Sequence, residues 1–234
     1  MTTSGTTNFL PSVGELVLAA YRRVGVHRSE ITSEHLADAR NETNLMQAEW
    51  AALGPLLWTV GLQSQALTTG TPTYSVPPDT IMVLDAYISI PNGDGTTVDR
   101  VITAMSRSEY AAMPDKLQKS APTSYWFDRL VAPTITLWPN PDASTEYTLN
   151  YYTFSQIQDA TLQGALQPQI PYFWLDAYVA GLARRLKMIY PTENQVPYAD
   201  FVAEAQRAYN IASAQGTEGT PLYIAPAVDS YWRA

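Results

Sequence analysis

Hydrophobic residues recur at helical spacing in four stretches of the chain, two near its start and two near its end. The clearest stretch is 171–190, PYFWLDAYVAGLARRLKMIY, in which large apolar residues return every three or four positions. A proline opens this stretch and another follows it, which is typical of the first turn of a helix and of the position just beyond its end. The pattern predicts a central helix with Asp176, Arg184 and Lys187 directed away from its packed face. The predicted packed face consists of Leu175, Tyr178, Val179, Leu182, Leu186 and Ile189.

Two further helices are predicted near the start of the chain. Ser12 and Glu15 have the spacing of a capping box, which predicts the start of a helix. Gly25 suits the C-terminal cap of the same helix. The apolar stripe of this helix is Val13, Leu16, Val17, Ala20, Tyr21 and Val24. The second helix begins near Thr32 and ends at a Gly-Pro pair. Its apolar seam, which predicts lengthwise packing on a partner helix, is Leu36, Ala39, Thr43, Met46, Trp50 and Leu53.

A fourth helix is predicted to begin near Asn194 or Pro197, after a loop short enough to make it an antiparallel neighbour of the central helix. Its apolar stripe is Tyr198, Phe201, Val202, Ala205, Tyr209 and Ala212. An amphipathic helix needs a partner for its apolar face, so we expect all four helices to form one bundle. Ala177, Ala180 and Gly181 lack bulk, so we expect another backbone to approach the central helix closely there.

Between the helices the hydrophobic period changes to that of β-strands. Strands are predicted over residues 57–65, 85–90, 97–102, 124–130, 134–138 and 146–154. The second and third flank PNGDGT, a strong hairpin signal because glycine tolerates the positive φ of such turns. In the last strand Tyr147, Leu149 and Tyr151 share one face. Ser106 and Glu109 form another capping box, which predicts a short helix within this region.

The predicted fold class is α+β: a four-helix bundle formed by both chain ends, an inserted antiparallel β-sheet or sandwich domain, and an extended C-terminal tail. The helical domain would comprise residues 1–56 plus 168–216, the inserted β domain residues 57–167, and the C-terminal arm residues 217–234. Within the insertion, residues 68–78 are predicted to be a loop and residues 156–169 a polar linker, because both are rich in polar or turn-forming residues.

Composition excludes several classes of protein. The chain has no cysteine, so disulfides, thiolate catalysis and cysteine-ligated zinc are ruled out. A net charge of −8 argues against a protein that holds nucleic acid by charge alone, although an acidic wall suits DNA that only slides past. The sequence shows neither a basic start followed by an apolar run nor a stretch of about 18 apolar residues, so we expect no signal peptide and no membrane span.

Candidate catalytic and metal-binding residues are few. His27 in a predicted loop and His35 in the first turn of a helix lack the spacing of a metal pair, so we expect both to be ordinary surface residues. Residues 92–96 with Asp99 resemble part of a calcium loop, but the bidentate glutamate is missing and turn chemistry explains them. The sequence contains no nucleophile elbow and no phosphate-binding loop. We therefore expect no enzymatic activity, no cofactor and no metal.

Two groups of side chains are open to more than one interpretation. The first is the basic group Arg184, Arg185 and Lys187. It would contact DNA or, as is commoner, form a solvated face at a helix end. The second is the aromatic group Tyr151, Tyr152 and Phe154. It would stack on sugars or bases, or fill a core and one packed outer face. The aromatic group keeps open an alternative function, a carbohydrate-active protein that is either a glycan-binding module or a glycosidase.

Four segments spread over the chain carry a family resemblance. They are 44–50 (NLMQAEW), 106–122 running into 125–129 (YWFDR), 135–142 (ITLWPNPD) leading to 147–152, and 171–186. Together with the order helices–sheet–helices, they resemble the head-to-tail adaptors of short-tailed bacteriophages. These connector or head-completion proteins sit on the portal ring and retain packaged DNA. The four segments are packing and turn patterns, and none is a catalytic signature.

The resemblance implies a structural virion protein that acts without catalysis. It implies a homo-oligomeric ring, usually twelvefold, beneath the portal protein at the neck between capsid and tail, assembled from protein made in the host cytoplasm. Such a ring would extend the DNA conduit, letting double-stranded DNA pass without sequence-specific binding. It would also provide the platform for the tail nozzle and tail-fibre proteins. No membrane takes part.

The C-terminal arm, residues 217–234, is expected to bind a partner, which is the portal, a neighbouring subunit or both. It holds many large apolar side chains, while Pro221 and Pro226 discourage a helix. The resemblance implies an extension that reaches onto the portal, and folding back onto its own domain is the alternative. Tyr231 and Trp232 are the expected anchors, because rigid amphipathic rings dominate binding energies. The candidate partner-binding residues are Leu222, Tyr223, Ile224, Val228, Tyr231, Trp232 and Arg233.

Overall fold

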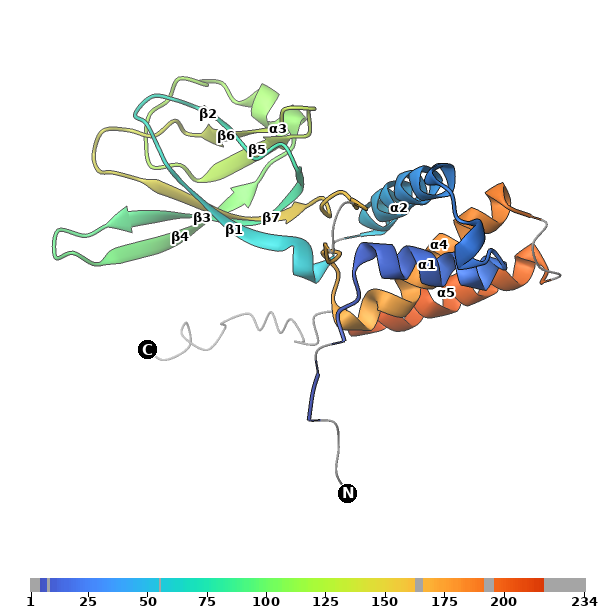
Figure 1. Cartoon of the computed structure of the whole chain (residues 1–234). Coiled ribbons are helices and arrows are strands. Elements are labelled where there is room, and N and C mark those ends of the chain that lie inside the picture. The colour runs from blue at the N-terminus through green and yellow to red at the C-terminus, as the bar shows by residue number, and fades with distance from the viewer. Residues whose placement is uncertain (1–4, 8, 55, 163–165, 192–195, 217–234) are drawn as a thin grey trace, which may run out of the picture.

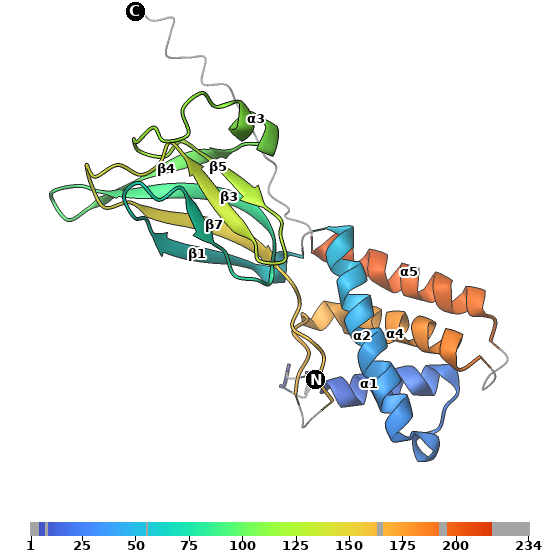
Figure 2. The same cartoon turned by 90° about the horizontal axis from the view of Figure 1, so that it is seen from above.

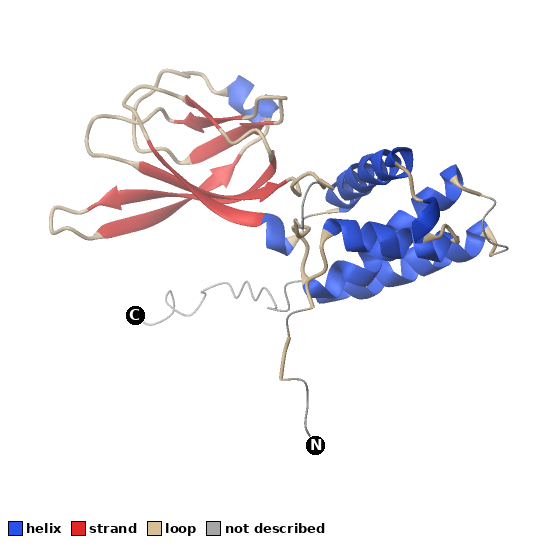
Figure 3. Ribbon diagram, viewed as in Figure 1, coloured by secondary structure: helices blue, strands red, loops and turns tan. Residues whose placement is uncertain are grey.

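The structure is a computed structural model that describes residues 5–7, 9–54, 56–162, 166–191 and 196–216. Helices gather at one end of the molecule and strands at the other (Figures 1 and 2), and the short helix Arg107–Ala112 lies among the strands (Figure 3). The described residues contain five α-helices and seven strands. The predicted α+β class is therefore confirmed.

The four long helices come from both ends of the chain. They are α1 (Val13–Val24), α2 (Ser33–Leu53), α4 (Leu175–Ile189) and α5 (Tyr198–Gln215). Helices α1, α2 and α5 each pack against α4, and buried side chains of all four helices belong to one hydrophobic cluster. Single-turn 3-10 helices at Arg28–Glu30, Leu57–Thr59 and Tyr172–Trp174 connect these helices to their neighbours. The prediction that α4 is central is consistent with this packing.

Helix α1 matches its sequence pattern closely. The Ser12 side chain accepts a hydrogen bond from the Glu15 backbone N–H, and the Glu15 carboxylate accepts one from the Ser12 N–H at 2.8 Å. Gly25 has φ 103°, in the left-handed region that glycine adopts at the end of a helix. All six residues of the predicted apolar stripe are buried. Local capping and periodicity were therefore sufficient to predict this helix.

Helix α2 departs from its prediction at both ends. Thr32 caps it as expected, and the middle of the seam is buried. Leu36 and Leu53, however, are exposed, and 63% of the Leu53 surface remains accessible. The predicted seam is therefore packed from Ala39 to Trp50 and wrong at Leu36 and Leu53, where α2, which runs at an angle to α4 (Figure 2), leaves these two side chains exposed.

Lys187 contradicts the prediction that it lies away from the packed face of α4. It is only 5% exposed, and its Nζ donates a hydrogen bond to the Pro191 carbonyl at 2.9 Å. The same Nζ lies 5.8 Å from the centroid of the Phe201 ring on α5. Its stem is covered by the antiparallel helix α5 while its charged end reaches a backbone oxygen and an aromatic face. Ile189, predicted to be packed, is exposed.

The close approach to α4 occurs at Gly181, but the approaching group is a side chain. A Cβ atom at Gly181 would lie 2.6 Å from the Met46 sulfur of α2. At Gly181 the neighbour is therefore a side chain of α2 and not another backbone. A long thioether fits irregular gaps, and Met46 is completely buried there.

Helix α5 begins at Tyr198, directly after Pro197, and runs antiparallel beside α4 (Figure 2). Tyr198 and Val202 are exposed although the predicted stripe included them. The buried residues of α5 are Phe201, Ala205, Ala208 and Ala212. The packed face is thus shifted toward small residues, which let α5 lie close to α4.

The strands form one curled sheet in the order β1-β7-β3-β4-β5-β6-β2. Their bounds are β1 (Val60–Ala66), β2 (Thr73–Ser75), β3 (Thr80–Pro91), β4 (Thr97–Ala104), β5 (Ser124–Asp128), β6 (Thr134–Trp138) and β7 (Thr148–Ser155). All neighbouring strands are antiparallel except β4 and β5, which pair in parallel through Thr103–Ser124 and Ala104–Tyr125. The prediction of a wholly antiparallel sheet is therefore wrong at this pair. The long connection through α3 (Arg107–Ala112) permits the parallel pairing, which no tight hairpin allows.

The predicted loop 68–78 contains the short strand β2, which pairs with β6. This strand has three residues, which are too few for an alternating hydrophobic pattern to be recognised in the sequence. The predicted hairpin is confirmed as β3 and β4, and the Asn92 N–H donates to the Thr96 carbonyl across its turn. Ser106 caps α3 as predicted. Residues 57–59, predicted as the start of a strand, form a 3-10 turn that precedes β1.

The curled sheet encloses its own hydrophobic cluster. Tyr147, Leu149 and Tyr151 face this cluster, as their alternation predicted. The same cluster also contains the buried side chains of Tyr74, Ile88, Ile102, Tyr125, Ile135 and Leu137. Phe154, near the end of β7, belongs instead to the cluster of the helices. Strand β7 therefore contributes to both hydrophobic clusters.

The predicted polar linker 156–169 is partly packed. Ile157 and Ala160 are buried in the helical cluster, and the Ala160 N–H donates a hydrogen bond to the Asn44 side chain at 2.8 Å. The prediction is wrong for these residues, because two apolar anchors among polar neighbours are enough to fix the segment against α2.

Candidate interaction surfaces

An aromatic cluster joins the helices to the sheet. The Trp174 ring lies 5.0 Å from the Trp50 ring, 4.9 Å from the Trp58 ring and 5.3 Å from the Tyr209 ring, measured between centroids. Trp58 lies in the 3-10 turn that leads into β1, and its indole N–H donates to the Gln169 carbonyl at 3.1 Å. Tilted and edge-on aromatic pairs of this kind stabilise beyond the area they bury. The cluster therefore anchors the entry into β1 to α2, α4 and α5.

The basic group of α4 is paired with acidic residues of α2. Arg185 donates to Glu42 at 2.9 Å and to Glu49 at 2.6 Å, and Arg184 donates to Glu49 at 2.8 Å. Burial alone would raise the pKa of Glu49, but the hydrogen bond from Arg185 and the two positive charges lower it below its usual value. The prediction of a solvated helix end is wrong for these two arginines, since they link two helices.

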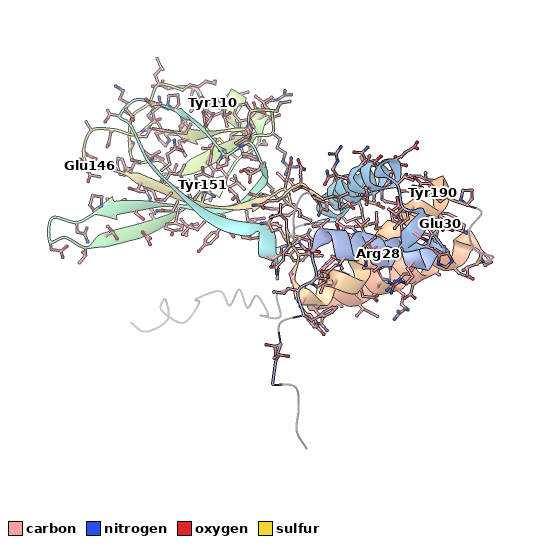
Figure 4. The ribbon with its side chains drawn as sticks, viewed as in Figure 1. Arg28, Glu30, Tyr110, Glu146, Tyr151 and Tyr190 are labelled. Carbon is pink, nitrogen blue, oxygen red and sulfur yellow. The ribbon has the colours of Figure 1, made fainter. Side chains whose placement is uncertain are left out.

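His35 is half-buried, so the prediction that it is an ordinary surface residue is wrong. Its ring stacks on the Tyr190 ring at 4.6 Å, and the Tyr190 hydroxyl donates to Asp38 at 2.6 Å. Burial and the hydrogen bond to Asp38 raise the pKa of Tyr190 to about 12. The Tyr21 hydroxyl donates to the His35 carbonyl. These contacts join α1, α2 and the end of α4, where Figure 4 labels Tyr190. These contacts therefore hold the helices in position, and they do not bring the His35 ring and a carboxylate together as a catalytic acid–base pair would require.

The remaining candidates for metal binding have structural roles. His27 is exposed, and its backbone N–H donates to the Glu30 carboxylate. In the hairpin turn, the Asp94 carboxylate accepts hydrogen bonds from the Thr96 N–H and hydroxyl, which lower its pKa. Among the described residues no group of three or more His, Asp or Glu side chains is placed to hold a metal ion. Within the same ranges, no helix is long and apolar enough to cross a membrane.

The aromatic group on β7 is divided between two faces. Tyr151 and Phe154 are buried in different clusters, and only Tyr152 is exposed. Tyr151, labelled in Figure 4, belongs to the cluster enclosed by the sheet, whereas Tyr152 pairs across strands with Leu62 on the outer face. The three rings therefore do not form a common stacking platform for sugars.

Exposed apolar side chains form a patch that the sequence pattern did not predict. Phe9, Leu10 and Leu166 are exposed near the start of α1, and Tyr172 lies against Thr6–Thr7 and Phe9 across an open hollow. The Val13 N–H donates to the Leu166 carbonyl, which brings these segments together. The apolar pair Phe9-Leu10 in a polar stretch was the available sequence signal. An exposed apolar patch of this kind is typical of a protein–protein contact.

The described chain ends beside a second groove. Gly216 follows α5 and lines a groove of about 180 Å³ together with Leu53, Leu56, Trp58 and Trp174. The predicted partner-binding residues, which begin six positions after Gly216, lie outside the described residues. They are Leu222, Tyr223, Ile224, Val228, Tyr231, Trp232 and Arg233.

Comparison with protein families gives a match that covers most of the chain. The model of the SU10 adaptor protein family matches residues 12–227. No curated protein matches the chain. The match includes all five helices and all seven strands of the described fold. The resemblance to head-to-tail adaptors is thus confirmed, and the chain belongs to the SU10 adaptor protein family, a family of head-to-tail adaptors of short-tailed phages.

Proposed function

We propose that this phage structural protein forms a closed, twelvefold ring beneath the portal and provides the platform for the tail nozzle and tail fibres. The observation that carries the proposal is the family match over residues 12–227. Membership of the family implies a place at the virion neck and interaction with portal and tail components. Head-to-tail contacts between identical subunits close into a ring when the rotation permits.

The division of the fold supports two separate roles. We assign residues 1–56 and 168–216 to a four-helix bundle that contacts the portal and neighbouring subunits, and residues 57–167 to an inserted domain that projects outward or toward the tail. Two hydrophobic clusters, one of the helices and one enclosed by the sheet, favour this division, although Phe154, Ile157 and Ala160 of the inserted segment pack in the helical cluster. The aromatic cluster around Trp174 joins the sheet to the helices, as a protein that connects the portal to the tail would need.

The charges favour a conduit that does not grip DNA. The chain carries a net charge of −8, and the two arginines Arg184 and Arg185 are neutralised by Glu42 and Glu49. Acidic surfaces repel phosphate, so DNA moving through the ring would meet no strong counter-charge from this group. A carbohydrate-active protein remains the alternative, and the separation of Tyr151 from Tyr152 on opposite faces gives it no support.

We assign attachment to the portal to residues 217–234. Burying a large apolar side chain yields about 1.5–3 kcal/mol. Ordering each backbone residue costs roughly 1–2 kcal/mol. Ordering the whole arm would cost at least as much as burying its large apolar side chains yields, so net binding requires a groove that receives the aromatic anchors Tyr231 and Trp232. Deleting residues 217–234 is expected to leave thermal melting of the helices nearly unchanged and to weaken portal binding strongly. Normal portal binding by the truncated chain would contradict this assignment.

The test of the proposed function is electron microscopy of the protein mixed with the portal protein of the same phage. A closed ring of many copies on one face of the portal is the expected result. Glycan binding by the isolated protein, or saturable turnover of peptidoglycan that a single carboxylate substitution abolishes, would favour the alternative.

A further inference from the structure

The sheet has two long edges without a partner among the described residues. Strand β1 pairs with β7 on one side only. Strand β4 pairs with β3 along its length, but meets β5 only at Thr103 and Ala104, so residues 97–102 have one unpaired side. Figure 2 shows β1 and β4 on opposite sides of β3 and β7. Each edge presents backbone N–H and C=O groups that another strand can pair with.

The β1 edge lacks the usual protection against such pairing. Its sequence, VGLQSQA, contains no charged residue and no proline. Natural edge strands are normally guarded by lysines, prolines, bulges or a covering segment, because an unguarded edge pairs with other chains. In a chain with a net charge of −8, an uncharged edge is also a place where identical copies meet without repulsion. The edge is therefore suited to a second copy of this chain.

Strand directions make the two edges complementary. Because β1, β7, β3 and β4 are successively antiparallel, β1 and β4 run in opposite directions. A neighbouring copy related by a rotation about a ring axis keeps nearly the same orientation, so its β4 would meet β1 as an antiparallel pair. Such pairs have well-aligned hydrogen bonds. A head-to-tail contact of this kind repeats around a ring.

The side chains that flank the edges also match. Ser64 pairs with Asn150, Asn150 with Tyr87, and Tyr87 with Val101, so these residues share the outer face of the sheet. Leu62, two positions from Ser64, lies on the same face and is 49% exposed, and Val101 is 78% exposed. Edge pairing between copies would bring Val101 of one copy beside this apolar face of the next.

We propose that β1 of each subunit pairs antiparallel with residues 97–102 of β4 in the next subunit, so that the sheets continue around the ring. The proposal rests on the proposed ring function. A strand pair of this length buries less than the roughly 1,200 Å² of a stable free complex. The pairing therefore forms on the portal, where neighbouring copies are held at high effective concentration, and not between free chains.

The absence of cysteine allows a direct cross-linking test. The variant with both Ser64→Cys and Val101→Cys places one thiol at each edge on the same face. After incubation with the portal protein, treatment with a short bismaleimide is expected to give a ladder of linked subunits. Each single variant, and the double variant without portal, is expected to stay monomeric. Linked dimers of the Ser64→Cys variant alone would show that two β1 edges meet, which overturns the proposal.

A charge variant provides the second readout. The variant with both Leu62→Lys and Ser64→Lys changes exposed positions of β1, and Val131→Lys adds a charge at a fully exposed turn as the matched control. The β1 variant is expected to melt as the wild type does and to leave incomplete rings on the portal, while the control gives complete rings. Complete wild-type rings without cross-links between β1 and β4 would overturn the edge pairing and leave the ring function standing. Absence of any ring with the wild type would overturn both.

Discussion

Replacing Trp50 by alanine tests whether helices from both chain ends share one core. Trp50 is 5% exposed, and its ring lies 5.0 Å from Trp174 and 6.3 Å from Tyr209, which belong to the C-terminal half. Removing a buried indole costs about 3–5 kcal/mol. In a chain of this size each kcal/mol lowers the melting temperature by about 2–4 °C, so we expect a decrease of roughly 6–20 °C.

The assay is thermal and urea unfolding followed by far-ultraviolet circular dichroism, which reports the helices. Trp126→Ala is the matched control, because Trp126 is half-buried in the sheet and its ring stacks on Tyr110 with a centroid distance of 5.5 Å. This variant is expected to disturb the helical transition much less. A loss below about 1 kcal/mol for Trp50→Ala, or equal losses for both variants, would refute the shared core.

Three further results are expected. Gly181→Ala should destabilise α4 despite the helical preference for alanine, because the new methyl group would lie 2.6 Å from the Met46 sulfur. Gly14→Ala is the control, since a methyl group there would have no neighbour within 4 Å, and it should stabilise the protein by up to about 1 kcal/mol. Melting temperatures that move in the same direction for both variants would contradict this reasoning. The lowered pKa of Glu49 means that its contribution to stability is present above the ordinary pKa of about 4.3 and is lost as pH falls through the lowered value. Glu49→Gln should therefore be less stable at pH 7 and lose less stability on acidification in urea titrations, and parallel pH profiles would argue against the ion pairs. In the same titrations at pH 7, Arg185→Gln should lower the free energy of unfolding, since it leaves Glu42 and Glu49 without their shared partner.

Features fixed by neighbouring residues could be predicted from the sequence. The capping box of Ser12 and Glu15 and the glycine cap at Gly25 depend on contacts within a few positions. The hairpin around residues 92–96 was predictable for the same reason, because its turn residues dictate the backbone geometry. The alternation of β7 correctly identified the face that carries Tyr151.

Features fixed by distant contacts could not be predicted. Arg185 and Glu49 are 136 positions apart, and no local pattern reveals that α2 crosses α4 where they meet. Lys187 was predicted to lie away from the packed face because it is not on the apolar stripe of α4, and no local pattern reveals that α5 covers this side of the helix. The parallel pairing of β4 and β5 follows a long connection, for which sequence periodicity carries no information about direction. The membership of the adaptor family was accessible only through the family resemblance, since a structural role leaves no motif comparable to a catalytic signature.

The most direct test of the adaptor function is cryo-electron microscopy of the neck of the intact virion. The proposal predicts a closed ring that contains many copies of this chain and contacts the portal through the helical part of each copy. The curled sheets are expected to be continuous from one subunit to the next. One or two copies per particle, or a position away from the neck, would contradict the function proposed for this protein.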